Sequence, residues 1–221
     1  MMRYSKLDVL SLAFSTGIVP VFYHRDAETV RRVVKACYDG GIRVFEFTNR
    51  GYFADEVFGE LSRYVLSACP GMVLGAGSVV DAATAAMYVQ RGASFVVGPL
   101  FSADVAKFCH RRGVLYVPGC GSATEVGEAQ ESGCDLVKVF PGDVLGAGFV
   151  KSLKAPMPWS RFLVTGGVRP EERNLRSWFG AGADCVGIGS SLFPESIIES
   201  GDWGSVTELC GRALSIVADV R

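Results

Sequence analysis

The chain has 221 residues, of which 49% are hydrophobic, and its 22 Lys and Arg nearly balance its 23 Asp and Glu, which leaves a formal net charge of −1. This is enough apolar material for one globular domain with a sizeable core, so we assign residues 1–221 to a single domain. A charge near zero, without basic blocks, argues against nucleic acid and against an anionic membrane surface as partners.

The apolar runs and the cysteines indicate a cytoplasmic protein. The longest uncharged stretch, residues 64–80, is broken by a proline and three glycines, so we expect no membrane-spanning helix. The N-terminus lacks the basic and apolar regions of a secretion signal. The seven cysteines are an odd number and lie at least 11 residues apart, which argues against disulfides and structural zinc and favours reduced, buried thiols. With only two histidines, His24 and His110, we expect no metal site.

The predicted elements begin with a helix over residues 6–15 and a short apolar strand over residues 18–23. Asp26 can then cap a helix that keeps its apolar residues on one face and ends at Gly40. From this point one pattern recurs: a glycine that ends a helix is followed two residues later by a short β-rich run. The pattern begins at Gly41, Gly92, Gly133 and Gly182.

Other short apolar runs lie before and between these segments and bring the number of predicted strands to eight, at the spacing of a βα unit. They are residues 18–23, 72–74, 114–117 and 161–164, and a last helix is predicted over residues 206–220. Buried strands that alternate with amphipathic helices predict a parallel α/β fold, here a (β/α)8 TIM barrel with an extra N-terminal helix. An open doubly wound sheet is the alternative, but no Gly-x-Gly-x-x-Gly fingerprint follows the first strand.

Two charged residues lie inside predicted strands, at the end of the barrel where active sites occur. Glu46 stands between two phenylalanines and Lys138 between two valines, so alternation along each strand turns both side chains toward the barrel interior. Burial disfavours the charged form of an amine and makes it nucleophilic, and a carboxylate across the cavity can carry protons. We therefore predict that Lys138 and Glu46 perform Schiff-base chemistry on a carbonyl substrate, with a purely structural ion pair as the alternative.

Two glycine-rich turns follow the seventh and eighth predicted strands. The residues assigned to substrate binding there are Thr165, Gly166, Gly167, Gly189, Ser190 and Ser191. Loops at these positions of a TIM barrel often bind phosphate through backbone N–H groups, although glycines there can also serve tight packing alone. Arg50 lies just beyond Glu46 and Thr48 at a strand end, where we predict that it holds a second anion such as a carboxylate, with Thr48 lining the same site.

Five motifs stand at the ends of the predicted strands. They are residues 41–50 (GIRVFEFTNR), 75–79 (GAGSV), 118–119 (PG), 138–141 (KVFP) and 165–168 (TGGV). In this order, from about Gly17 to Phe193, they resemble the 2-keto-3-deoxy-6-phosphogluconate aldolase family, also known as 4-hydroxy-2-oxoglutarate aldolases.

This resemblance implies a class I aldolase that splits the phosphorylated keto-acid into pyruvate and glyceraldehyde 3-phosphate with no metal and no cofactor. Lys138 matches the family's Schiff-base lysine, and Glu46 matches its general acid/base. The other matching positions are Arg50 and Ser78 for the pyruvyl carboxylate, Phe140 near the imine, Thr165 at the same end of the site, and Gly166, Gly167 and Ser191 for the phosphate. The resemblance also implies a homotrimer.

Four positions depart from the usual family pattern: Ser78, Asn49, Gly142 and Gly98. None removes a catalytic group, but they leave the preferred stereoisomer and end group open. The galactonate-derived stereoisomer and unphosphorylated 4-hydroxy-2-oxoglutarate are the alternative substrates. A non-catalytic phosphate-binding barrel, or a phosphosugar isomerase with Glu46 as its base, is the alternative from another class. The burial predicted for Lys138 argues against both, because a permanent charge there is costly.

Overall fold

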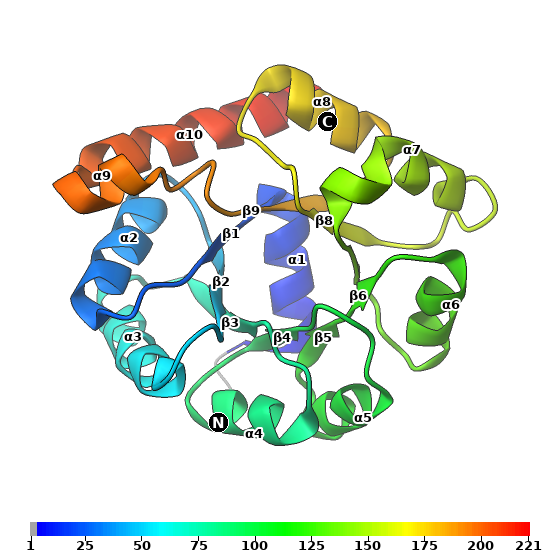
Figure 1. The fold of residues 1–221 in the computed structure, drawn as a ribbon, viewed down its shortest axis with the longest axis horizontal. Helices are drawn as coiled ribbons and strands as arrows, with labels where there is room; N and C mark the ends of the chain where they lie inside the picture. Colours follow the sequence, from blue (N-terminus) through cyan, green and yellow to red (C-terminus); the bar gives the residue numbers. More distant parts are fainter. Residues whose placement is uncertain (1–3) are drawn as a thin grey trace.

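Nine strands, paired in parallel, form the centre of the structure, a computed structural model that describes residues 4–221 (Figure 1). They are β1 (Ile18–Phe22), β2 (Val44–Thr48), β3 (Val73–Gly77), β4 (Phe95–Val97), β5 (Leu115–Val117), β6 (Gly119–Cys120), β7 (Val137–Val139), β8 (Phe162–Thr165) and β9 (Cys185–Ile188). Their order in the sheet is β5-β4-β3-β2-β1-β9-β8-β7-β6. Only Pro118 separates the two outer strands, β5 and β6, so the chain itself closes the sheet into a barrel.

Helices alternate with the strands and surround them. They are α1 (Lys6–Thr16), α2 (Ala27–Asp39), α3 (Ala54–Ala68), α4 (Ala82–Gln90), α5 (Ala103–Arg112), α6 (Ala123–Glu131), α7 (Gly142–Lys154), α8 (Glu172–Gly180), α9 (Glu195–Ser200) and α10 (Trp203–Val220). Figure 1 shows α2 to α10 as a ring around the strands, whereas α1 lies across one end of the barrel. The predicted TIM-like barrel with an extra N-terminal helix is confirmed.

The number of strands differs from the prediction of eight, and the reason is Pro118. The run predicted over residues 114–117 continues as β6, which pairs with β7, whereas β5 pairs with β4. Proline has no N–H to donate to a ladder, so the strand is interrupted where it changes partners. The carbonyl oxygen of Pro118 still accepts a hydrogen bond from the backbone N–H of Lys138 at 2.8 Å, which holds β7 against this junction.

Four of the helices that directly follow a strand begin with a capping side chain. The caps are Asp26, Asp81, Ser102 and Ser122, and each accepts a hydrogen bond from the backbone N–H three residues further on. At Asp26 the side-chain and backbone hydrogen bonds from Thr29 lower the pKa of the carboxyl group. These caps set the point at which each crossover leaves the C-terminal end of its strand, so they help to shape the loops at that end.

The core has two layers, and the inner layer includes residues of α1 that cover one end of the barrel. The outer layer packs strand residues such as Phe45 and Phe47 against the helices. The inner layer joins residues near the N-terminal ends of strands, such as Val19 and Val73, to Val9 and Ala13 of α1. Helix α1 therefore closes the N-terminal end, which leaves the C-terminal end available for a site.

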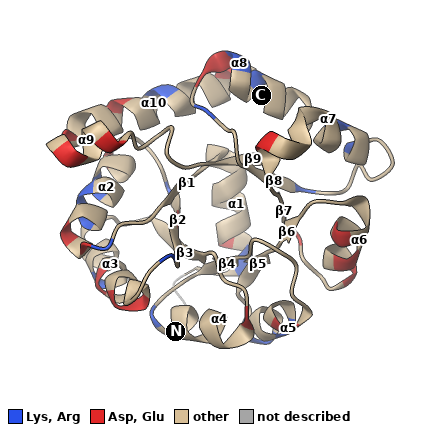
Figure 2. Ribbon diagram, in the orientation of Figure 1, with Lys and Arg blue, Asp and Glu red and all other residues tan. Residues whose placement is uncertain are grey.

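Charged residues lie mainly on the outer helices (Figure 2). Among residues 4–221, no helix is both long and apolar enough to cross a membrane. All seven cysteines are buried and carry free thiols, as the sequence predicts.

We expect the native protein to react with thiol reagents at none of its cysteines near pH 8, and at all seven once it is unfolded. Burial raises the pKa of the thiols of Cys109, Cys120 and Cys134 to about 12, so the reactive thiolate is scarce far above neutral pH. Titration with a chromogenic disulfide, with and without denaturant, measures this difference. Fast labelling of any cysteine in the native state would contradict the burial described here.

Candidate active site

Glu46 on β2 and Lys138 on β7 meet inside the barrel. The Lys138 Nζ lies 3.8 Å from the Glu46 Oε1, and their side chains are 7% and 1% exposed. The alternation that places Phe45 and Phe47 in the outer layer turns Glu46 inward. Gly77 of β3 makes room for it, because a Cβ built on Gly77 would overlap the Glu46 carboxylate.

Unpartnered polar atoms gather at this position. Among the described residues, five buried side-chain N or O atoms lack a hydrogen bond, and four of them belong to Glu46, Thr48 and Thr165. The fifth is the Nε of Arg31 on the outer helix α2. A buried carboxylate without a hydrogen bond costs stability, and 3.8 Å from an amine is too long to count as one. These atoms are therefore placed to receive hydrogen bonds from, or donate them to, a bound molecule.

A hollow of about 430 Å³ opens beside these residues at the C-terminal end of the barrel. It is lined by Val21, Phe22, Tyr23, Thr48, Arg50, Phe140, Thr165, Gly166, Gly167, Val168, Arg169, Gly187, Gly189, Ser190 and Ser191. The lining holds two arginines and no Asp or Glu, so the hollow suits an anionic molecule.

The two glycine-rich turns present backbone donors to this hollow. Among residues 4–221, no loop or side-chain acceptor is found for the N–H groups of Gly166, Gly167, Ser190 and Ser191. The Ser191 hydroxyl donates to the carbonyl oxygen of Val168 at 2.8 Å and so ties the two turns together. Gly166 and Gly167 have φ angles of 102° and 68°, a region that favours glycine. The turns thus form a cradle that an anion can enter.

The remaining predicted residues lie at the same end with different exposures. Phe140 places its ring centroid 5.0 Å from the Lys138 Nζ and forms part of the wall. Arg50 is exposed at the rim, just beyond β2. Ser78 follows Gly77 with a φ of 59°, an uncommon conformation for a serine, and is half-buried without lining the hollow itself. The predicted residues therefore lie at one end of the barrel. Glu46, Lys138 and Ser78 do not line the hollow itself, and Lys138 lies next to it, against the lining residue Phe140.

Two lining residues with polar side chains were not predicted as site residues from the sequence. Tyr23 lies just beyond β1, and Arg169 lies just beyond the Gly166–Gly167 turn. Tyr23 is the last residue of a predicted strand and Arg169 follows a motif, so the signal was their position at a strand's C-terminal end. Neither breaks an apolar pattern as Glu46 and Lys138 do, and an exposed arginine has no distinctive sequence context.

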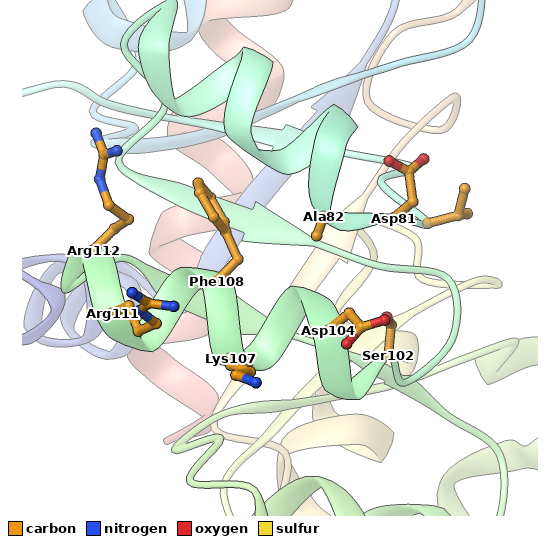
Figure 3. A pocket seen from close by; sticks show the side chains of 9 residues that line it. Asp81, Ala82, Ser102, Asp104, Lys107, Phe108, Arg111 and Arg112 are labelled. Carbon is orange, nitrogen blue, oxygen red and sulfur yellow. The ribbon is translucent and has the colours of Figure 1, made fainter.

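A second hollow, of about 630 Å³, lies between α4 and α5 on the outside of the barrel (Figure 3). Phe108, Lys107 and Arg112 approach it from α5, and Asp81 lies at the start of α4. It is larger than the first, but its charged residues are exposed and it contains none of the unpartnered buried atoms. Among residues 4–221, no group of three His, Cys, Asp or Glu side chains is placed to hold a metal ion. The C-terminal hollow is thus the better candidate site.

Comparisons with known proteins agree on one family. The model of the family described as KDPG and KHG aldolase matches residues 11–209. A 2-dehydro-3-deoxy-phosphogluconate aldolase from Treponema pallidum is 33% identical over 201 residues, which cover 90% of this chain and 93% of that protein. A 2-dehydro-3-deoxy-6-phosphogalactonate aldolase from Escherichia coli is 34% identical over 122 residues, 55% of this chain and 58% of that protein. Among solved structures, this chain is similar to the crystal structure of a KDPG aldolase from Legionella pneumophila, in which pyruvate is captured as a covalent carbinolamine. The two share a TM-score of 0.84 and 25% identity, and the match covers 92% of this chain and 97% of that one.

Proposed function

The chain belongs to the KDPG and KHG aldolase family, and on this premise we propose that it cleaves 2-keto-3-deoxy-6-phosphogluconate to pyruvate and glyceraldehyde 3-phosphate. Such an enzyme is an aldolase, a carbon–carbon lyase. The observation that carries the proposal is the buried Lys138 amine, 3.8 Å from a Glu46 carboxylate whose two oxygens lack hydrogen bonds, beside a hollow lined by arginines and no acids.

Lys138 is the proposed nucleophile. Its neutral amine adds to the C2 carbonyl of the keto-acid, and the resulting carbinolamine loses water to form a protonated imine. Glu46 takes the proton of the C4 hydroxyl as the bond between C3 and C4 breaks. The electron pair of that bond moves into the imine and gives an enamine, while C4 leaves as the aldehyde of glyceraldehyde 3-phosphate. Protonation at C3 and hydrolysis of the imine then release pyruvate and restore the amine.

The two ends of the substrate are assigned to opposite sides of the hollow. Arg50, with Ser78 nearby, is proposed to hold the pyruvyl carboxylate, and Phe140 to cover the imine. The backbone N–H groups of Gly166, Gly167, Ser190 and Ser191, which have no acceptor in the described loops, are proposed to bind the phosphate. Thr48 and Thr165 supply buried hydroxyls that lack partners and can bond to the substrate's own hydroxyls.

The assembly and extent of the enzyme are also proposed. We assign residues 1–221 to one cytoplasmic aldolase domain, of which residues 1–3 lie outside the described residues. Exposed apolar side chains lie on three consecutive loops at the C-terminal end, among them Tyr52, Phe53, Val80 and Leu100, and they support self-association. The homotrimer itself is proposed from the family resemblance. Sedimentation equilibrium, which measures the molar mass, tests this assembly.

The substrate is tested by pyruvate release from three keto-acids: 2-keto-3-deoxy-6-phosphogluconate, its galactonate-derived stereoisomer and 4-hydroxy-2-oxoglutarate. We expect the highest kcat/KM for the first. A higher value for either of the others would reassign the substrate within the family. No pyruvate from any of the three would overturn the aldolase function.

Gly189→Val tests the phosphate cradle. A Cβ at Gly189 would meet only the Val21 carbonyl oxygen, at 3.7 Å, so the side chain fits the fold but occupies the hollow. Gly167 is less suitable, because its φ of 68° and a Cβ contact of 2.7 Å to Asp143 would strain the backbone. We expect KM for the phosphorylated substrate to rise about 10-fold or more, which corresponds to the loss of one hydrogen bond to a charged group. KM for 4-hydroxy-2-oxoglutarate should change little.

Gly148→Val is the matched control, since Gly148 lies on α7 with open space around it and does not line the hollow. If Gly189→Val weakened both substrates equally, the phosphate would bind elsewhere.

A further inference from the structure

Arg169 is an arginine without a partner at the edge of the hollow. Its side chain is exposed, and no ion pair or side-chain hydrogen bond of residues 4–221 involves its guanidinium. Arg161 and Arg176, on the same part of the chain, are paired with Asp184 and Glu172. An arginine that lines an acid-free hollow and has no carboxylate of its own is free to bind an anion there.

The backbone that carries Arg169 is held in place. Its N–H donates to the Asn174 Oδ1 at 2.9 Å, and the Asn174 Nδ2 donates to the carbonyl oxygen of Gly167 at 3.1 Å. Pro170 follows and is buried, which restricts Arg169 to extended conformations. Val168, on its other side, is only 5% exposed. The backbone of Arg169 is thus held in one conformation, which reduces the conformational entropy lost when the guanidinium binds a ligand.

Arg169 and Arg50 approach the hollow from different sides. Arg50 follows β2 and Arg169 follows β8, and β1 and β9 lie between those strands in the sheet. Three strand spacings are about 14 Å along the sheet. At this separation the two arginines are better placed to bind two anionic groups, one at each end of a single bound molecule, than to bind one anion together.

The phosphate cradle also has a negative neighbour. Asp143, in the first turn of α7, lies against the Gly166–Gly167 turn, and its Oδ1 would be 2.9 Å from a Cβ on Gly166. A phosphate monoester carries close to two negative charges near pH 7, so a phosphate in the cradle meets a repulsive charge from this side. A cation on the same turn offsets this repulsion, and Arg169 is the one that lines the hollow there.

We propose that Arg169 is a specificity-determining residue, whose guanidinium binds the terminal phosphate and sets the preference for phosphorylated over unphosphorylated keto-acids. This proposal rests on the proposed aldolase function. The planar guanidinium donates two parallel hydrogen bonds to phosphate oxygens. In 4-hydroxy-2-oxoglutarate the distal anion is a carboxylate bonded directly to C4, so it lies closer to the imine than the phosphate oxygen on C6 and carries a single charge.

The test compares Arg169→Ala, Arg169→Lys and the control Arg173→Ala with wild type on both keto-acids. Arg173 is also exposed and lies on α8 without lining the hollow, so its removal changes the net charge equally. For Arg169→Ala we expect kcat/KM for the phosphorylated substrate to fall about 10- to 100-fold through KM, the range for a hydrogen bond between charged groups. Cleavage of 4-hydroxy-2-oxoglutarate and the thermal midpoint should stay unchanged, and Arg169→Lys should recover part of the loss.

Inorganic phosphate is an independent probe. It should inhibit wild type competitively against the phosphorylated substrate, and the inhibition should weaken in Arg169→Ala but not in Arg173→Ala. An unchanged ratio of kcat/KM for the two keto-acids in Arg169→Ala, with wild type active, would overturn the role of Arg169 alone. Wild type that cleaved neither keto-acid would overturn the aldolase function itself, so the two failures are distinguishable.

Discussion

Lys138→Arg should abolish cleavage of the keto-acid while the protein still folds. Arginine replaces the amine that lies 3.8 Å from the Glu46 Oε1 by a guanidinium, which does not lose its proton near neutral pH and cannot form an imine. We expect turnover to fall by about four powers of ten or more, as when other enzymes lose a catalytic nucleophile. The measurement is pyruvate release under saturating substrate, with circular dichroism and the thermal midpoint recorded on the same sample.

The Lys138 side chain is only 7% exposed, so a larger side chain at this position can disturb the interior. Lys138→Met serves as the second variant, because it is shorter, uncharged and suited to an apolar wall. Lys151→Arg is the control, since this lysine is exposed on α7. Turnover near the wild-type value in both Lys138 variants, with the control unchanged, would mean that another group reacts with the carbonyl.

Glu46→Gln should lower turnover by about two to four powers of ten, the usual worth of general acid/base catalysis. The amide keeps the shape of the carboxylate in the space left by Gly77 but cannot accept a proton from the C4 hydroxyl. The loss should fall on kcat more than on the binding of pyruvate. Steady-state kinetics together with pyruvate inhibition separate these two effects, and Glu128→Gln, on the outer helix α6, is the control.

The same variant distinguishes a catalytic carboxylate from a structural ion pair. Because neither Glu46 oxygen has a hydrogen bond, Glu46→Gln breaks none and should leave the thermal midpoint nearly unchanged, whereas the loss of one partner of a structural ion pair would lower it. A marked fall in the midpoint, together with unchanged turnover, would identify the pair as a structural device.

The barrel could be predicted from the sequence because its signals are local. Glycines that end helices and the short apolar runs after them recur along the chain, and each repeat marks one βα unit. The inward direction of Glu46 and Lys138 also follows from alternation along single strands. What the sequence could not supply was the interruption at Pro118, because that depends on which neighbour each half of the strand pairs with.

The site was less predictable than the fold, because its geometry depends on contacts between distant segments. The hydrogen bond that ties Ser191 to Val168 joins two loops 23 residues apart, and no local pattern indicates it. Nothing in the sequence marks Arg169 as a binding residue. The structure does, because Arg169 lines a hollow without acidic residues and hydrogen bonds with Asn174 hold its backbone. Ser78, Glu46 and Lys138 show the reverse: sequence motifs assigned them to the site, but none of the three lines the hollow itself.

Whether Lys138 reacts covalently with a keto-acid is tested most directly by trapping with pyruvate and borohydride, followed by peptide mass spectrometry. Borohydride reduces an imine to a stable secondary amine, so we expect one pyruvate-derived adduct per chain, located on Lys138 and absent from Lys138→Arg. No adduct on wild type, or an adduct of equal yield on Lys35, Lys107 or Lys151, would contradict it.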